Sequence, residues 1–444
     1  MASIIDHRHP LQDPSQPEHP TKNRPDKSQS AQKELGHKYV QNLGLANARD
    51  IVKMLLWNDK FGIKFMRLSS EMFPFASHAE HGYRLGPFAS EVLAEAGKVA
   101  ARLGHRLTTH PGQVCCCFVL SEKSARAEIF PSPDTLQFTQ LGSPRKEVVE
   151  SAIRDLEYHD ELLSLLRLPD QQNRDAVMIV HMGGTFGDKA ATLDRFRKNY
   201  VGLSGGIKAR LVLENDDVSW TVHDLLPICE ELNIPLVLDY HHHNILFDSE
   251  HCREGTYDIS QPTISDRITA TWTRKGIKQK MHYSEPCAGT VTPRDRRKHS
   301  PRVSTLPPCP NDMDLMIEAK DKEQAVFELM RTFKLPGFDK FNDMIPHERT
   351  DENLPPPKIP KKKSAGNGNA KGPKRRKTTV EGAVEVDGDA GEGDSEGPIL
   401  AGIPAEEIGM GGPESRVYWP PGNEEWLRPK KRDMKRPQVV EESD

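Results

Sequence analysis

The stretch 210–244 constrains the fold more than any other part of the chain. It contains two short apolar runs, 211–213 and 236–238, which end in the carboxylates Glu214 and Asp239. A span with helical spacing of leucine and isoleucine lies between them. Continuous apolar strands separated by helices are typical of a parallel sheet that is covered on both faces. Because α/β barrels gather their chemistry at the carboxyl ends of the strands, this stretch is predicted to form part of an active-site floor.

The same arrangement of a short apolar strand followed by a polar side chain recurs along the chain. Five further strands are predicted at 63–68, 106–109, 177–180, 279–283 and 314–317. Helices are predicted at 47–57 with Asn47 as N-cap, and at 91–103, 143–166, 189–200, 221–232 and 322–333. This gives seven strand ends, whereas a closed TIM barrel has eight strands. Since the first recognisable element is a helix, we predict an α/β fold of the TIM (β/α)8 type that lacks its first strand in this chain and has an open seam.

Composition divides the chain into three parts. Residues 1–35 are rich in Pro, His, Gln and Ser with almost no apolar periodicity, so we predict that they are disordered. Residues 36–345 carry the barrel pattern. Residues 346–444 are predicted to be a disordered charged tail, in which basic clusters at 361–363 and 374–377 precede an acidic, glycine-rich run. These clusters resemble nuclear-localisation signals, although solvated tail charge is an equally good interpretation.

Cysteine usage, apolar runs and net charge limit the compartment and the partners. The seven cysteines show no CxxC pair, which indicates a reducing compartment rather than a disulfide framework. The chain has no apolar run long enough to span a bilayer and no apolar core of a signal peptide, so we expect no membrane association. The net charge of −4 means that any binding to nucleic acid depends on a local surface.

Imidazole and carboxylate groups are concentrated at the strand ends. The candidate ligands are His110, His181, Glu214, Asp239, His242, His282 and Glu318 at strand ends, with His78 and His299 in loops. Nitrogen and oxygen ligands of these types suit Zn²⁺ and Mn²⁺. Because their number exceeds what one metal ion needs, the sequence predicts a multinuclear site, which is suited to in-line displacement at phosphorus.

Ordinary structural roles compete with this interpretation for each residue. A single histidine at a strand end is more often structural than a ligand, but so many ligand-type residues are hard to explain by coincidence. The run 241–243 can point at most one or two rings at a metal, and we favour the spacing Asp239-x-x-His242. Lys280 precedes His282 by two residues, so both side chains lie on one face of a strand.

At these residues the sequence resembles the ultraviolet-damage endonuclease family, in particular its fungal branch. The matching segments cover most of residues 36–335: LLWNDKFGIKFMRLSSEMFPFASH at 55–78, RLTTHPGQ at 106–113, SPRKEVVESAIRDLEYHDELL at 143–163, VHMGGTFGDKAATLDRFRKNY at 180–200, RLVLENDDVSW at 210–220, PLVLDYHHHNIL at 235–246, TWTRKGIKQKMHYSE at 271–285 and MDLMIEAKDKEQAVFEL at 313–329. These motifs are long and specific.

The resemblance implies a TIM barrel like that of xylose isomerases and of a trinuclear-zinc abasic-site endonuclease. It also implies a nick immediately 5′ to pyrimidine dimers and 6-4 photoproducts in double-stranded DNA, which leaves a 3′-hydroxyl and a 5′-phosphate. The implied cofactors are two to three divalent metal ions, Mn²⁺ or Zn²⁺ with Mg²⁺ as a further option, and no organic cofactor. We expect a monomer that acts in the nucleus, with the mitochondrion left open.

The resemblance also assigns roles to residues. The family's metal ligands fall on His78, His110, His181, Glu214, Asp239, His242, His282, His299 and Glu318. Lys280 matches a lysine that the family can carboxylate near its metals, which would give it an anionic head. We expect Glu214, Lys280 and His242 to act in catalysis, with Glu214 as a bridging ligand. Apart from the resemblance, basic residues could hold the DNA backbone, although charges on a helix surface are more often just solvated; the candidates are Arg195, Lys198, Arg274, Lys275 and Lys278.

The family's lesion-probing motif is interrupted in this chain. The family has a Gln followed by an aromatic residue, whereas Val114 follows Gln113 here, and the motif resumes at Phe138. We hypothesise that 114–137 is an atypical insertion that derives from an unspliced intron. A mature message that contains these codons would contradict this hypothesis. Joined directly, Gln113 and Phe138 would insert at the lesion and stack on bases.

Three alternatives remain open beside a photoproduct endonuclease. An abasic-site endonuclease would use the same metal set. A sugar isomerase on the same barrel would need neither a basic DNA-binding face nor Gln113. A damage-binding form with impaired catalysis would result if the missing first strand prevents the barrel from closing.

Overall fold

The computed structural model describes residues 30–112, 140–252, 259, 261–310 and 312–341. The chain divides into two units, and residues 345–403 form the second, which contains no described residue. The predictions for residues 1–29, for the insertion 114–137 and for the tail 346–444 therefore lie outside the described residues. All of the described residues belong to the first unit.

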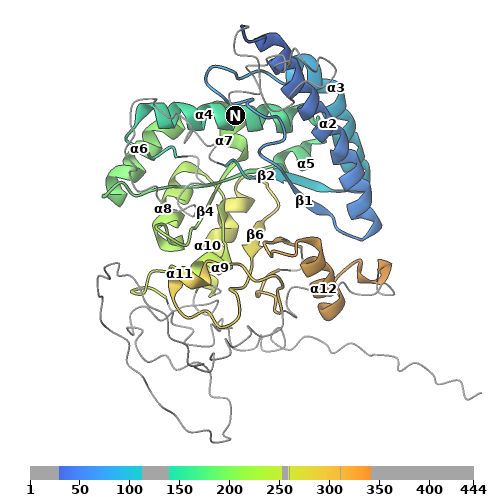
Figure 1. Cartoon of the computed structure of the whole chain (residues 1–444). Coiled ribbons are helices and arrows are strands. Elements are labelled where there is room, and N and C mark those ends of the chain that lie inside the picture. The colour runs from blue at the N-terminus through green and yellow to red at the C-terminus, as the bar shows by residue number, and fades with distance from the viewer. Residues whose placement is uncertain (1–29, 113–139, 253–258, 260, 311, 342–444) are drawn as a thin grey trace, which may run out of the picture. The chain divides into compact units, whose positions relative to one another are not determined.

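Seven parallel strands form the centre of the described structure (Figure 1). In chain order they are β1 (Phe65–Leu68), β2 (Arg106–Thr109), β3 (Met178–His181), β4 (Leu211–Glu214), β5 (Leu236–Val237), β6 (Lys280–Tyr283) and β7 (Asp314–Ile317). The first five pair in sequence order, β6 pairs with β7, and a parallel bridge from Asp239 to His282 connects the two groups. Strands that pair in chain order, each in parallel with the last, confirm the TIM-type architecture.

The barrel has its seam where the sequence predicted it. Within the described residues no strand precedes β1, and β1 and β7 are not paired with each other. The first described element is instead the long helix α2 (Lys33–Lys60), which lies alongside α3 (Gly86–Leu103). The absence of an eighth strand from the described residues leaves one edge of β1 and one edge of β7 without a ladder partner.

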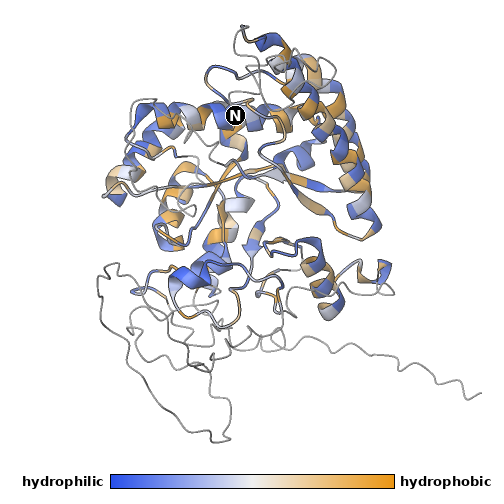
Figure 2. Cartoon of the chain, viewed as in Figure 1, coloured by the Kyte–Doolittle hydropathy of each residue, from blue (hydrophilic) through white to orange (hydrophobic). Residues whose placement is uncertain are grey.

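Helices separate successive strands and cover the outside of the sheet. The remaining helices are α4 (Lys146–Leu165), α5 (Asp170–Asp175), α6 (Lys189–Val201), α7 (Gly205–Arg210), α8 (Val222–Leu232), α9 (Tyr240–His243), α10 (Pro262–Thr273), α11 (Pro293–Arg296) and α12 (Glu323–Phe333), with a short 3-10 turn at Phe338–Lys340. Figure 2 shows mainly apolar colour along β1 and β4, polar colour on β6 and mixed colour along the helices. None of the described helices combines the length and the apolar character needed to cross a membrane.

The core forms because the central strands are apolar on both faces. Every residue of β3 and β4 is buried. Two fully buried tryptophans satisfy their indole N–H groups on backbone carbonyls, Trp220 on Gly183 and Trp272 on Leu236. Such pairing removes the cost of burying the polar end of a large ring.

Helix α2 begins well before the helix that the sequence predicted. Its first turns bury Gly36, Val40 and Gly44, which are four residues apart and therefore share one face. A side chain at Gly44 would collide with the ring of Phe73, so close packing depends on the glycine. The predicted helix start at Asn47 is wrong for this reason, because a stripe of small residues carries little hydrophobic signal. Asn47 is not an N-cap, and its side chain donates to the carbonyl of Met72.

Helix limits elsewhere depend on local capping. Thr221 caps α8 in a reciprocal capping box with Asp224, as the predicted start of that helix requires. The predicted start of α4 at Ser143 is wrong, since the helix begins at Lys146 and the Ser143 hydroxyl accepts from the N–H of Arg145 instead. The polar helix α5 and the short helix α7 had no apolar period that would have revealed them.

Acid should destabilise this fold through His105. Its ring is fully buried, with Nδ1 donating to the carbonyl of Arg106 and Nε2 accepting from the amide of Asn58. Burial lowers the pKa of His105 from 6.5 to about 4, so the unfolded chain takes up the proton first as pH falls. This contribution to stability is complete above pH 6.5 and is lost as the pH falls toward 4. Between pH 7.5 and 4.5 we expect the His105→Gln variant, with metals chelated, to lose about 2 kcal/mol less unfolding free energy than the wild type in urea titrations. Equal losses would contradict a neutral buried ring.

Candidate metal centre

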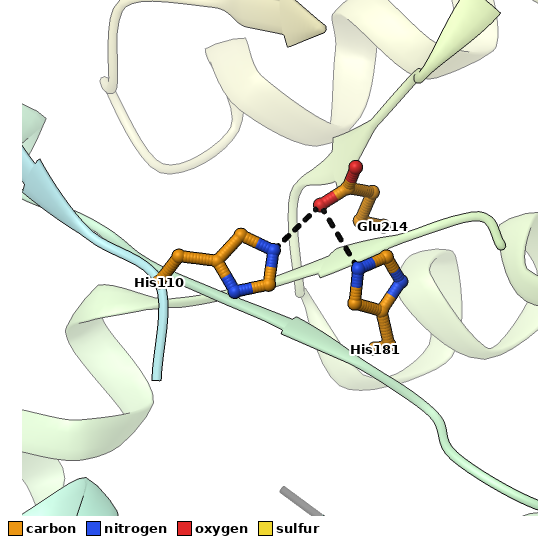
Figure 3. Close-up of side chains that lie close together, drawn as sticks. All are labelled: His110, His181 and Glu214. Atoms are coloured by element: carbon orange, nitrogen blue, oxygen red, sulfur yellow. Dashed lines mark hydrogen bonds and ion pairs between the residues drawn. The ribbon is translucent and has the colours of Figure 1, made fainter. Parts of the chain in front are cut away.

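Glu214 lies at the centre of the candidate metal site. It is the last residue of β4, its side chain is 1% exposed, and the strand register places it beside His181 on β3. Its Oε2 accepts from His110 Nε2 at 3.2 Å and lies 3.5 Å from His181 Nε2, as Figure 3 shows. Its Oε1 lies 2.8 Å from His282 Nδ1. Both oxygens of one buried carboxylate are therefore surrounded by imidazole nitrogens from different strands.

A second group of ligands gathers around the end of β5. Asp239 and His282 are bridge partners, and Asp239 Oδ2 lies 3.9 Å from His282 Nδ1. His242 Nδ1 lies 3.6 Å from the same oxygen and 3.7 Å from Glu214 Oε1. The Asp239-x-x-His242 spacing brings the two side chains together because Asp239 caps the short helix α9 that carries His242.

The two groups share one carboxylate. His110, His181 and Glu214 form one set, and Glu214, Asp239 and His282 form the other, with the ligand atoms of each set within 4.8 Å of one another. The buried Oδ2 of Asp239 accepts no hydrogen bond from the described residues, which is costly unless a cation satisfies it. Carboxylates and imidazoles in this arrangement fit a pair of divalent ions, which Glu214 would help to hold in both sets.

Burial and neighbouring charges shift the proton equilibria of these groups. Burial alone would raise the pKa of Glu214, but the imidazoles of His282 and His181 hold that pKa well below its usual range. Burial raises the pKa of Asp239 to about 7 and lowers that of His181 to about 3. Burial opposes the charge of His242, yet the carboxylates of Asp239 and Glu214 raise its pKa to about 10. Metal binding at His242 must therefore displace a proton.

Lys280 lies beneath the second group rather than among the carboxylates. It is the first residue of β6, is fully buried, and places its Nζ 2.6 Å from His282 Nε2. Burial lowers the pKa of Lys280 to about 7. This contact fixes the ring of His282 so that its other nitrogen, Nδ1, faces Glu214.

Glu318 and His299 are hydrogen-bonded to each other, and Glu318 lies close to His282. Glu318 follows β7, and its Oε1 is 3.7 Å from His282 Nδ1. Burial raises the pKa of Glu318, but the charges of His282 and Arg67 outweigh it and lower the pKa to about 2. His299 Nδ1 donates to the backbone carbonyl of Glu318 at 2.6 Å, so its Nε2 remains available to a ligand.

The structure does not bring every predicted residue into this group. His78 uses Nδ1 to accept the N–H groups of Glu80 and His81, stacks on the ring of His81, and is not among the residues that line the cavity at the site. Its role as a metal ligand stays a prediction. Gln113 and Phe138 lie outside the described residues.

Asn215 is a supporting residue that the sequence did not single out. Its side-chain N–H group donates to the carbonyl of Asp239, and its oxygen accepts from the N–H of the same residue. His242 Nδ1 lies 2.9 Å from the carbonyl of Asn215. The residue after Glu214 thus aligns the ends of β4 and β5. In the sequence, the only indication of this role was an amide side chain at the end of a strand.

The ligand groups open into a cavity of about 990 Å³. Its lining includes side chains at and beyond the strand ends, namely Arg67, His110, Glu214, His242, His299 and Glu318. Residues of α2, among them Asn47 and Met54, line it as well. This space exceeds what metal ions fill, so it can admit part of a substrate.

Lys275 and Lys278 make contacts within the fold, and their predicted DNA-backbone role stays a prediction. Both precede β6 and therefore lie at the amino ends of the strands, away from the metal centre. Lys278 Nζ pairs with Asp314, the first residue of β7, and Lys275 Nζ donates to the carbonyl of Lys208. Arg274, one residue earlier, donates to the carbonyl of Glu230. For Arg195 and Lys198 on α6 the role stays a prediction.

Comparison with known families gives this geometry a context. The model of the family described as UV-endonuclease UvdE matches residues 20–129 and 116–350. The chain belongs to this family. The two matched segments overlap within 114–137, where the sequence indicated an insertion.

Two curated relatives and one crystal structure support the family assignment. A UV-damage endonuclease of Neurospora crassa is 68% identical over 442 residues, which cover 100% of this chain and 63% of the relative. One from Schizosaccharomyces pombe is 55% identical, covering 68% of this chain and 45% of the relative. The chain thus spans less than two thirds of the length of either. The crystal structure of SacUVDE is 26% identical with a TM-score of 0.52, covering 69% of this chain and 89% of that one.

Substitution of Glu214, which belongs to both ligand sets, should release more metal than substitution of a residue that belongs to only one set. We expect the metal-loaded wild type to retain at least two equivalents of Mn²⁺ or Zn²⁺ after gel filtration, measured by plasma mass spectrometry. Glu214→Ala should lose most of both equivalents, because both ligand sets contain Glu214. Asp239→Asn should lose about one equivalent.

The control is Asp248→Asn, because the ion pair of Asp248 within the described part of the chain is with the exposed His251, outside the ligand sets. It should keep the wild-type metal content. Equal metal loss in Glu214→Ala and Asp248→Asn would exclude a site centred on Glu214.

Proposed function

We propose that the chain is a metal-dependent DNA repair endonuclease. It would nick the strand immediately 5′ to pyrimidine dimers and 6-4 photoproducts, leaving a 3′-hydroxyl and a 5′-phosphate. One observation carries the proposal: two ligand groups share the buried Glu214 at the floor of a cavity large enough for part of a DNA strand. Membership of a family whose curated members are named UV-damage endonucleases supports the choice of substrate.

Glu214 belongs to both ligand sets and would help to hold a divalent ion in each of them. His110 and His181 complete one ligand set, and Asp239 and His282 complete the other. Divalent ions held there supply Lewis-acid stabilisation of the charge that develops on the phosphodiester oxygens.

The other residues of the site keep this arrangement rigid. Asn215 holds Asp239 by two hydrogen bonds, Lys280 fixes the ring of His282, and the carbonyl of Glu318 orients His299. Ligands that are held before the substrate arrives need no reorganisation during the reaction, which is how electrostatic stabilisation becomes effective.

Recognition of the lesion belongs to residues outside the described part of the chain. We propose that Gln113 and Phe138 insert into the DNA duplex at the lesion once 114–137 is removed. A photoproduct weakens base stacking, so extruding the damaged nucleotides costs less than extruding normal ones. A nuclear location, an additional mitochondrial one and a monomeric state remain predictions.

Loss of the shared carboxylate charge should abolish cleavage but not binding. In Glu214→Gln, nicking of irradiated plasmid should fall by roughly a thousand-fold, because several kcal/mol of transition-state stabilisation depend on the shared ligand. Binding of damaged DNA should remain within about two-fold in a mobility-shift assay. Glu231→Gln, which removes a surface partner of Arg197, is the matched control and should nick normally. Full activity of Glu214→Gln would refute the assignment.

The insertion should lower activity on photoproducts without affecting the metal centre. A chain without 114–137 should nick a dimer-containing oligonucleotide faster than the full chain, at equal metal content, because Gln113 and Phe138 become neighbours. An oligonucleotide with an abasic site is the comparison substrate. Preferential abasic cleavage by both chains would favour an abasic-site endonuclease, and binding without cleavage would favour the impaired damage-binding form. Equal nicking of the dimer by both chains would contradict a disruptive insertion.

A further inference from the structure

Arg67 points into the barrel from the first described strand. Alternate side chains of a strand face opposite sides, so Arg67 shares a face with Phe65, while Met66 and Leu68 are buried on the other face. The ring of Phe65 lies 5.3 Å from the buried Nζ of Lys280 and is therefore on the inner face. Arg67 accordingly lines the cavity above the metal centre.

One nitrogen of Arg67 is held by a candidate metal ligand. Nη1 donates to Glu318 Oε1 at 2.8 Å, and this oxygen is also 3.7 Å from His282 Nδ1. The pair joins the carboxyl ends of β1 and β7, the two strands at the seam. It fixes the guanidinium group directly beside the ligand cluster.

The other donors of Arg67 make no hydrogen bond within the described residues. A guanidinium carries five N–H donors in a rigid fork, and in the described residues the only hydrogen bond of Arg67 uses Nη1. The side chain is 41% exposed, compared with 21% for Glu318. Nε and Nη2 are therefore available to a ligand that enters the cavity.

The charge balance of the cavity makes this cation important for an anionic substrate. Its described lining contains six carboxylates: Asp50, Glu71, Glu214, Asp216, Asp217 and Glu318. The fixed cations of that lining are Arg67 and Arg297. Arg297 is occupied by Asp217, with Nε 3.3 Å from Oδ2 and Nη2 donating to the backbone carbonyl at 2.9 Å. Arg297 is thus paired with a carboxylate outside the ligand sets, whereas Arg67 is paired with the candidate ligand Glu318 and so lies directly beside the ligand cluster.

We propose that Arg67 binds the phosphodiester group that is to be cleaved, while its Nη1 continues to hold Glu318. The planar fork of arginine matches two phosphate oxygens, which lysine as a point charge does not. A non-bridging oxygen held there would gain stabilisation as negative charge develops on it. The claim that this phosphodiester belongs to a DNA strand rests on the proposed function, whereas phosphate binding by Arg67 does not.

Inorganic phosphate is the probe that separates the two claims. Calorimetric titration of the metal-loaded full chain with phosphate should show a dissociation constant at least about ten-fold higher in Arg67→Gln than in wild type, counted per metal-loaded site. Arg67→Lys should fall between them, since it keeps the charge but not the fork. The control is Arg267→Gln, because Arg267 makes a similar pair with Glu230 outside the cavity and should bind phosphate as the wild type does.

Nicking of a dimer-containing oligonucleotide supplies the second measurement. Arg67→Gln should lower kcat by roughly a hundred-fold with little change in KM, because the contact strengthens in the transition state. Equal phosphate affinity in Arg67→Gln and Arg267→Gln would overturn the inference. It would also be overturned if Arg67→Gln lost metal while its remaining loaded sites bound phosphate normally, since Arg67 would then only position Glu318. Absence of nicking by the wild type would refute the proposed function and leave the phosphate result to stand alone.

Discussion

The structure depends on one buried carboxylate that is surrounded by imidazoles. An isolated carboxylate as buried as Glu214 would take up a proton, but His110, His181 and His282 hold it ionised. Those three rings come from three different strands, so the barrel must bring its strand ends together before the carboxylate is stabilised. The same carboxylate would help to hold two divalent ions, and this couples the integrity of the barrel to the chemistry at its rim.

A layer of hydrogen bonds beneath the ligands gives the site its precision. Asn215 grips the backbone of Asp239, and Asp216 accepts three backbone N–H groups in the loop after β4. Lys280 supports His282 from below. None of these contacts needs a metal ion, so the protein itself sets the orientation of the ligands. Ligands that are already oriented can stabilise a transition state without reorganising during the reaction.

The seam between β1 and β7 shows how a barrel with seven described strands still presents a continuous rim. The strands do not pair there, but the side chains of Arg67 and Glu318 meet across the gap. A long-range ion pair replaces backbone hydrogen bonds at this position. It also leaves a guanidinium facing the cavity, where the surrounding carboxylates would otherwise repel a nucleic-acid strand.

The sequence by itself determined the fold class, the seven described strands to within two residues, and the ligand types at the strand ends. It could do so because buried parallel strands are short and uniformly apolar, and because a carboxylate or imidazole directly after such a strand has few structural explanations. It failed where the signal was weak. The small-residue stripe of α2 hid the start of that helix, and the polar helices α5 and α7 had no apolar period.

Only the tertiary structure decided which of these residues meet. It grouped His110, His181, Glu214, Asp239 and His282, left His78 apart in its loop, and placed Lys275 and Lys278 at the far ends of the strands. It also revealed Asn215 and Arg67, whose partners are 24 and 251 residues away in the chain. Contacts over such separations depend on how the strands close around the axis, which no local sequence pattern encodes.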